Sequence, residues 1–206
     1  MKTSFAPAVA LVLAAAVAGS SVAQPAPPSR DPTQALSGAY KVEPNHTRIV
    51  FSVVHMGFTD YFGQFNGASG KLELNTANPA ASTVTVSIPT DSVDTSNSVL
   101  NGELKSAQWF DAAQYPTITF TTTKVKPTGP DAAELTGDLT FHGVTRPVTL
   151  EAKFNAAGPN PLNKHYTVGF NAKGHIKRSD FGVKTYVPLI GDDVDLTISA
   201  AFEKAS

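Results

Sequence analysis

Residues 166 to 176 read Tyr-Thr-Val-Gly-Phe-Asn-Ala-Lys-Gly-His-Ile, and this stretch decides the fold. Apolar or small residues occupy the even positions from Tyr166 to Ile176, and polar residues or glycine occupy the odd positions from Thr167 to His175. Successive side chains of a β-strand point to opposite faces, so this alternation predicts a strand with one dry face and one wet face. The dry face requires a hydrophobic core.

The same alternation recurs through most of the chain. It is clear from Ser82 to Ile88 and again in the last apolar series, which ends at Phe202. Because helical periodicity occurs in one place only, an antiparallel sheet closed on itself is the economical way to bury all the dry faces. Counting from Ile49, the sequence predicts an all-β fold in which about eight antiparallel strands form a single barrel.

The period changes to that of a helix from Ser98 to Phe110. Leu100 and Leu104 lie one turn apart on the same helical face. A helix this short is marginal on its own, so we expect it to cover one end of the barrel, with Trp109 and Phe110 as its anchors. The sequence leaves open whether it is a fixed plug or a movable lid.

The N-terminus is predicted to be a cleaved export signal, residues 1–23. Lys2 precedes an apolar run from Ala8 to Ala18, and small residues from Ser21 to Ala23 suit cleavage after Ala23. The run is shorter than the ~20 apolar residues that cross a bilayer, although an uncleaved membrane anchor is the alternative. The chain is therefore expected in the periplasm.

Two further segments follow the predicted signal. Residues 24–38 are rich in proline, alanine and serine, and this composition predicts a flexible tether that buries little surface. Residues 39–206 are assigned to the barrel domain. Nothing in the sequence indicates a second folded domain or an internal repeat.

Composition excludes several functional classes. The 16 Lys and Arg residues against 17 Asp and Glu residues give a formal net charge of −1, so no nucleic-acid partner is expected. The chain has no cysteine, and its five histidines do not fall at the spacing of a metal site. No metal, cofactor or catalytic residue is predicted, and the protein is not expected to be an enzyme.

Two charged clusters near the C-terminus have alternative interpretations. For Asp192, Asp193 and Asp195, we favour a solvated turn over a metal-binding or acid–base role. A basic cluster could bind a phosphate or an anionic lipid head group, but protection against strand pairing is the favoured interpretation. Its members are Lys173, His175, Lys177, Arg178 and Lys184.

The predicted inward face carries small residues among its large ones: Gly137, Ala152, Ala172, Gly174 and Ala200. A barrel of this size can be filled by its side chains or can hold one small ligand. Small inward residues would leave an apolar cavity, because no polar residue interrupts these series. Alternatively, they relieve crowding in a packed core, and the pattern does not decide between the two.

Several blocks of the sequence resemble the YceI-like family, in the family's order and over nearly everything from Tyr40 to the end. The helix block opens with Trp109-Phe110, where the family motif usually has two phenylalanines. The matching blocks are His46 to Phe51, Trp109 to Phe120, Gly137 to Val148, Arg178 to Gly182 and Gly191 to Val194.

The resemblance implies an exported, lipocalin-like barrel whose ligand is a polyisoprenoid lipid or an isoprenoid quinone, held without covalent attachment. It also implies transient contact with a membrane and leaves the oligomeric state open, a dimer included. An enzyme acting on such a lipid and a solid barrel that serves in stress protection or protein interaction are the competing readings. By position, the implied tunnel lining is Phe51, Val53, Phe65, Val86, Ile88, Phe120, Leu139, Val168, Phe170 and Ile198, with Leu100, Leu104, Trp109 and Phe110 closing one end.

Overall fold

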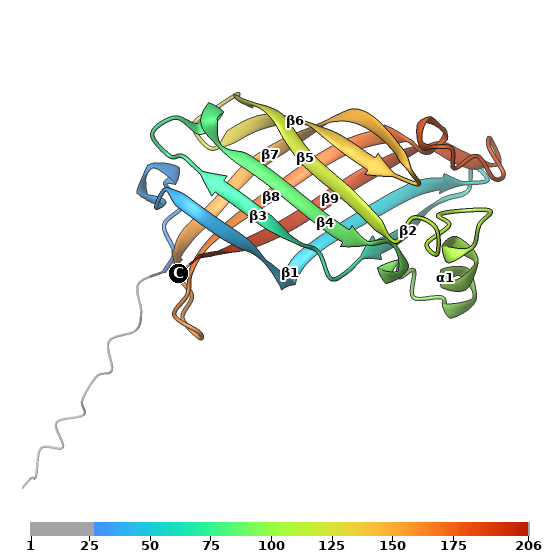
Figure 1. Ribbon diagram of the computed structural model, residues 1–206, viewed down its shortest axis with the longest axis horizontal. Helices are drawn as coiled ribbons and strands as arrows, with labels where there is room; N and C mark the ends of the chain where they lie inside the picture. Colours follow the sequence, from blue (N-terminus) through green and yellow to red (C-terminus); the bar gives the residue numbers. More distant parts are fainter. Residues whose placement is uncertain (1–26, 206) are drawn as a thin grey trace, which may run out of the picture.

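The computed structural model describes residues 27–205 and confirms the predicted antiparallel barrel (Figure 1). One nine-stranded sheet has the order β2-β1-β3-β4-β5-β6-β7-β8-β9, and β9 also pairs with β1. All strands except β2 therefore form a closed barrel, and β2 is an extra strand beside β1. The strands are β1 (Gly38–His55), β2 (Thr59–Phe65), β3 (Ser69–Leu74), β4 (Thr83–Pro89), β5 (Thr117–Pro127), β6 (Ala132–Phe141), β7 (Val144–Pro159), β8 (Tyr166–Lys177) and β9 (Ile190–Lys204).

β8, which contains the stretch that predicted the fold, pairs with β7 and β9. Val168 and Ala172 are buried on its inner face, whereas Lys173 and His175 are exposed on its outer face. The predicted alternation is confirmed at these positions.

β1 is longer than the predicted first strand, because it begins at Gly38 rather than near Ile49. Its pairing with β9 shifts register between Glu43 and Arg48, a segment that contains Pro44. Proline has no N–H to donate to a ladder, so a bulge is the form in which a long strand accommodates it. The prediction missed this half of β1 for that reason.

β2 and β3 pair with successive halves of β1, Ile49 lying opposite Phe65 and Gly38 opposite Leu74. The sequence predicted one bent strand from Tyr61 to Asn75. Instead the strand breaks at residues 66–68, where Gly67 has a φ of +67°. A positive φ takes the chain out of extended geometry, which only glycine tolerates readily.

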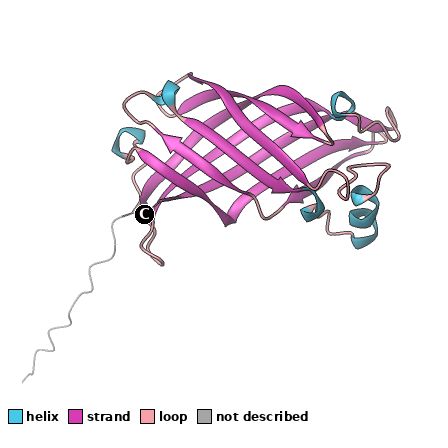
Figure 2. Cartoon of the chain, viewed as in Figure 1, coloured by secondary structure: helices cyan, strands magenta, loops and turns pink. Residues whose placement is uncertain are grey.

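The two ends of the barrel differ (Figures 1 and 2). One end, called the α1 end below, carries α1 (Ser98–Lys105) and the 3-10 turns η3 (Thr90–Ser92) and η4 (Arg178–Phe181). The opposite end carries the turns η1 (Pro32–Gln34) and η2 (Pro79–Ala81). None of the helices within residues 27–205 is long and apolar enough to cross a membrane.

α1 is shorter than the helix predicted from Ser98 to Phe110. It begins after Asn97, whose side chain accepts hydrogen bonds from two backbone N–H groups, and it ends at Ser106, which is extended. The chain then turns back toward α1, and the Phe110 N–H donates to the Leu104 carbonyl at 3.0 Å. Trp109 and Phe110 are both buried, and neighbouring residues of a helix point about 100° apart, so an irregular turn buries this pair more fully.

The described part of the predicted tether is bound to the barrel. Ser29 and Ala157 exchange two backbone hydrogen bonds of 2.8 Å, and Ala35 is buried. The proline-rich composition gave no sign of this, because the contacts come from main-chain groups at the end of β7. The predicted signal and its cleavage site lie outside the described residues.

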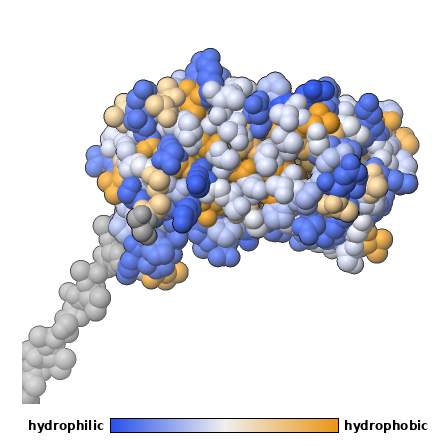
Figure 3. All heavy atoms as spheres, viewed as in Figure 1, coloured by the Kyte–Doolittle hydropathy of each residue, from blue (hydrophilic) through white to orange (hydrophobic). Residues whose placement is uncertain are grey.

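The outer surface is largely hydrophilic on the face that Figure 3 displays, with apolar side chains between the polar ones. The sequence led us to expect a cover over the outer face of the first strand, because Val50 and Val54 are apolar. Val54 is instead 49% exposed, so no segment covers that position within residues 27–205.

Candidate functional site

The barrel encloses a cavity of about 380 Å³. Its wall is formed by inward-facing side chains of the strands, which include the small residues Ala152, Ala172 and Ala200. The residues of the predicted lining that border this cavity are Phe65, Val86, Ile88, Phe120, Leu139, Phe170 and Ile198. The sequence left a cavity and a packed core as alternatives, and the fold contains a cavity.

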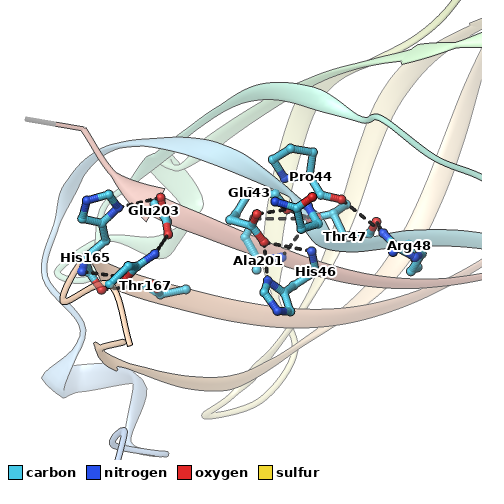
Figure 4. A network of polar contacts seen from close by, with 11 residues as sticks. Glu43, Pro44, His46, Thr47, Arg48, His165, Thr167, Ala201 and Glu203 are labelled. Carbon is cyan, nitrogen blue, oxygen red and sulfur yellow. Dashed lines mark hydrogen bonds and ion pairs between the residues drawn. The ribbon is translucent and has the colours of Figure 1, made fainter. Parts of the chain in front are cut away.

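The hydroxyl groups of Thr47 and Thr122 in the wall are bonded to the wall itself. The Thr47 hydroxyl donates to the Glu43 carbonyl at 2.8 Å and accepts from the Ala201 N–H at 3.1 Å (Figure 4). The Thr122 hydroxyl accepts from the Val84 N–H at 2.9 Å. Because these groups are satisfied, the wall offers hydrocarbon surface to a ligand.

Charge is confined to the rim of the cavity. Among the described residues that line it, Asp131 is the one charged side chain, and it lies 3.4 Å from the ammonium group of Lys153. The lining therefore holds no pair of groups that could act as acid and base on a ligand.

The space beside two of the small inward residues, Gly137 and Gly174, is already filled by neighbouring side chains. A Cβ atom at Gly137 would lie 2.5 Å from the Phe120 ring, and one at Gly174 would lie 2.4 Å from a Leu150 methyl group. These glycines admit large cross-strand neighbours rather than a ligand. The three alanines, in contrast, do border the cavity.

Aromatic rings close the α1 end. Phe110 lies 5.9 Å from Phe65 and 5.2 Å from Phe141, and Phe141 lies 5.9 Å from Phe181, as measured between ring centroids. Phe65 and Phe141 border the cavity, whereas Phe110 packs behind them. This stack separates the cavity from α1.

The other predicted residues lie outside the cavity lining. Phe110 is part of the aromatic stack but does not border the cavity, and Leu100, Leu104 and Trp109 also pack at the α1 end. Phe51 packs over Gly63, where a Cβ atom would lie 2.2 Å from the Phe51 ring. Val53 and Val168 share strands with lining residues but do not border the cavity themselves.

Arg178 holds the loop that follows η4, a role that the sequence did not reveal. The side chain is only 5% exposed, and burial lowers the pKa of its guanidinium group. The guanidinium carbon lies 5.5 Å from the centre of the Trp109 ring. Its N–H groups donate, at 2.8 to 3.1 Å, to the carbonyls of Val183, Thr185, Ile190 and Gly191.

His175 and Lys177 of the basic cluster also have partners. The ring nitrogens of His175 lie 2.9 Å from carboxylate oxygens of Asp193 and Asp195. These hydrogen bonds raise the pKa of His175, and the one to Asp195 has the larger effect. Lys177 lies 2.7 Å from Asp193. Within residues 27–205, no three His, Asp or Glu side chains are placed to hold a metal ion. These contacts fit the interpretation of a solvated surface.

The cavity opens at the end opposite α1. Exposed residues there, Pro79, Pro127 and Pro130, belong to the cavity lining, so this end faces solvent. We call it the open end.

Residues 29–37, here called the N-terminal strap, cross the open end. Pro32, Thr33 and Ala35 contribute to the cavity lining. The Tyr40 hydroxyl donates to the Leu36 carbonyl at 2.5 Å, and the Tyr166 hydroxyl donates to the Gln34 carbonyl at 3.3 Å. Burial is the larger cause that raises the pKa of Tyr40 to about 12, and the nearby Tyr166 is the smaller one. The Tyr40 hydroxyl therefore remains a donor at neutral pH.

Residues 40–202 match the model of the YceI-like domain. The chain belongs to the YceI-like family. Protein YceI of Escherichia coli O157:H7 is 41% identical over 167 residues, which cover 80% of this chain and 86% of that protein.

Two solved structures extend the comparison of this YceI-like chain. The Campylobacter jejuni YceI protein has a TM-score of 0.67 and 27% identity, with 74% of this chain and 90% of that chain covered. A polyisoprenoid binding domain from Saccharophagus degradans has a TM-score of 0.61 and 17% identity, covering 81% and 98% of the two chains. At that identity, the second likeness shows the YceI-like fold alone.

Proposed function

We propose that this chain is a periplasmic protein that holds a long-chain polyisoprenoid lipid, of the polyprenyl or quinone-precursor type, for sequestration or transport. The observation that carries the proposal is a cavity of about 380 Å³ whose wall is largely apolar and in which the hydroxyls of Thr47 and Thr122 are bonded internally. Ligand sites commonly measure about 300–1,000 Å³. Burying each methylene group returns ~0.8 kcal/mol, so a prenyl chain needs no polar contact to bind.

Two further points support a lipid over the competing functions. The Saccharophagus degradans domain of the same fold is named for polyisoprenoid binding. A solid barrel would have no internal cavity, whereas this barrel has one. An enzyme acting on the lipid would need a pair of acid and base groups, and Asp131 is the one charged residue in the described lining. Native mass spectrometry of protein purified without detergent should reveal a bound lipid.

Filling the cavity should weaken lipid binding. Ala172 borders the cavity from the middle of β8, so Ala172→Phe places a ring where the prenyl chain would lie. Lys173→Phe is the matched control, because Lys173 is exposed on the opposite face of the same strand. Titration of a fluorescent prenyl probe should show at least about tenfold weaker binding for Ala172→Phe, equal to the loss of ~1.4 kcal/mol. Equal binding by the two variants would contradict the proposed site.

The N-terminal strap, rather than α1, should control lipid exchange through the open end. Removing residues 24–36 breaks the Ser29 and Tyr166 hydrogen bonds and uncovers the open end. Each bond contributes ~0.5–1.5 kcal/mol, so prenyl-probe transfer to vesicles should be about tenfold faster. Trp109→Ala should destabilise the α1 end but leave transfer nearly unchanged, because Trp109 does not border the cavity. The reverse pattern would make α1 the lid.

Export should remove the predicted signal. If the signal is cleaved after Ala23, the protein recovered from the periplasm begins at Gln24. N-terminal sequencing of that fraction measures this directly. A chain that retains Met1 in the membrane fraction would mean an uncleaved anchor.

A further inference from the structure

The barrel wall has a seam between β7 and β8. Their pairing runs from Pro159 and Tyr166 to Leu150 and Gly174, and stops there. β7 continues to Val144 paired only with β6, and β8 continues to Lys177 paired only with β9. No ladder between β7 and β8 is formed over this part of the described barrel, so backbone hydrogen bonds do not hold the two strands together here.

The sequence of β7 fits such a seam. Pro147 lies within the stretch that is not paired to β8. Proline lacks an N–H donor and is confined in sheets to edges and bulges. At the far side of the seam, η4 turns the chain inward, and Phe181, 1% exposed, fills the space toward the α1 end.

A groove follows the seam on the outside of the barrel. Its floor includes Val148, Ile176 and Phe181, and charged side chains of both signs, among them Arg146 and Glu151, form its rim. Val148 and Ile176 also line the internal cavity. The same two aliphatic side chains therefore border both spaces, and they form a wall one side chain thick.

We propose that, while the N-terminal strap crosses the open end, this seam is a side opening of the cavity, closed by the side chains of Val148 and Ile176, through which an isoprenoid lipid enters and leaves. The proposal rests on the lipid-binding function above. No ladder between β7 and β8 has to break at Val148 and Ile176, so displacement of these two side chains is enough to open the wall here. The charged rim keeps the groove hydrated, which suits a lipid whose polar end stays in water while its chain lies inside.

The absence of cysteine allows a direct test. Val148→Cys places a thiol at the seam, and Leu139→Cys is the matched control. Leu139 also borders the cavity, is similarly buried at 9% against 7%, and lies on a strand paired on both sides. A charged, water-soluble thiol reagent should modify Val148→Cys about tenfold faster than Leu139→Cys, because local opening exposes the seam. Ile176→Cys provides a second reporter if Val148→Cys folds poorly.

The modified protein then tests the route of the lipid. A bulky adduct at Val148→Cys should slow transfer of the fluorescent prenyl probe at least about fivefold relative to the same variant before modification. Equal modification of the seam and control thiols, or transfer that is unchanged by the adduct, would overturn the side opening. Fast modification of the seam thiol, with no probe bound even by the unsubstituted protein, would instead refute the lipid-binding function and with it the lipid route.

Discussion

Arg178→Ala should be among the most destabilising single substitutions in this protein. The side chain is 5% exposed and donates to four backbone carbonyls of residues 183–191. Its removal leaves buried acceptors without donors and also removes the cation that lies over Trp109. Unsatisfied buried groups cost ~1–3 kcal/mol each, and water can reach some of these carbonyls, so we expect a loss of ~3–5 kcal/mol.

Denaturant unfolding followed by circular dichroism measures this loss. Trp109 is the single tryptophan, so its fluorescence reports on the same loop. Arg178→Lys should recover only part of the stability, because one ammonium group cannot reproduce the planar fork of donors. Lys177→Ala, which removes an exposed neighbour paired with Asp193, should change stability little. If Arg178→Ala were as stable as Lys177→Ala, the guanidinium group would not be holding the loop.

Two phenylalanine truncations should separate the cavity wall from the packed core. Phe181 is 1% exposed and does not border the cavity, so Phe181→Ala should cost ~3–5 kcal/mol in the lipid-free protein. Phe170 borders the cavity and contacts Phe154 and Phe202 at ring distances of 5.7 and 6.1 Å. Because one side of its ring faces empty space, Phe170→Ala should cost well below ~3 kcal/mol.

For lipid binding, Phe170→Ala should have the larger effect and Phe181→Ala the smaller one. The lost Phe170 ring is part of the wall that a prenyl chain would touch, so Phe170→Ala should weaken prenyl-probe binding about tenfold, which corresponds to ~1.4 kcal/mol. Phe181→Ala, measured under conditions where it remains folded, should bind nearly as well as the unsubstituted protein. A large loss of stability in Phe170→Ala with undiminished binding would favour a packed barrel at this site.

Local alternation was enough to predict the barrel. Val168 and Ala172 are buried whereas Asn171 and Lys173 are exposed, and such a two-residue period requires one dry face whatever the rest of the chain does. The small inward residues left a cavity and a packed core as alternatives, and the family resemblance supplied inward positions such as Phe120 and Phe170. The alternation and the inward-facing positions can be predicted from sequence because they depend on each strand separately.

The location of the opening was decided by tertiary structure. The family resemblance made Trp109 and Phe110 candidates for closing one end of the tunnel, but Phe65 and Phe141 from distant strands lie between them and the cavity. The proline-rich segment carried no periodic signal, yet it crosses the open end through main-chain bonds such as that between Ser29 and Ala157.

The role of Arg178 and the position of the seam were also decided by tertiary structure. Nothing in the sequence distinguished Arg178 as the donor to four carbonyls, and Pro147 alone did not show where β7 and β8 part. Local side-chain pattern fixes which face of a strand is dry. Which backbone groups remain unpaired, and which side chains fill the ends of the barrel, depends on how strands far apart in sequence meet when the sheet closes.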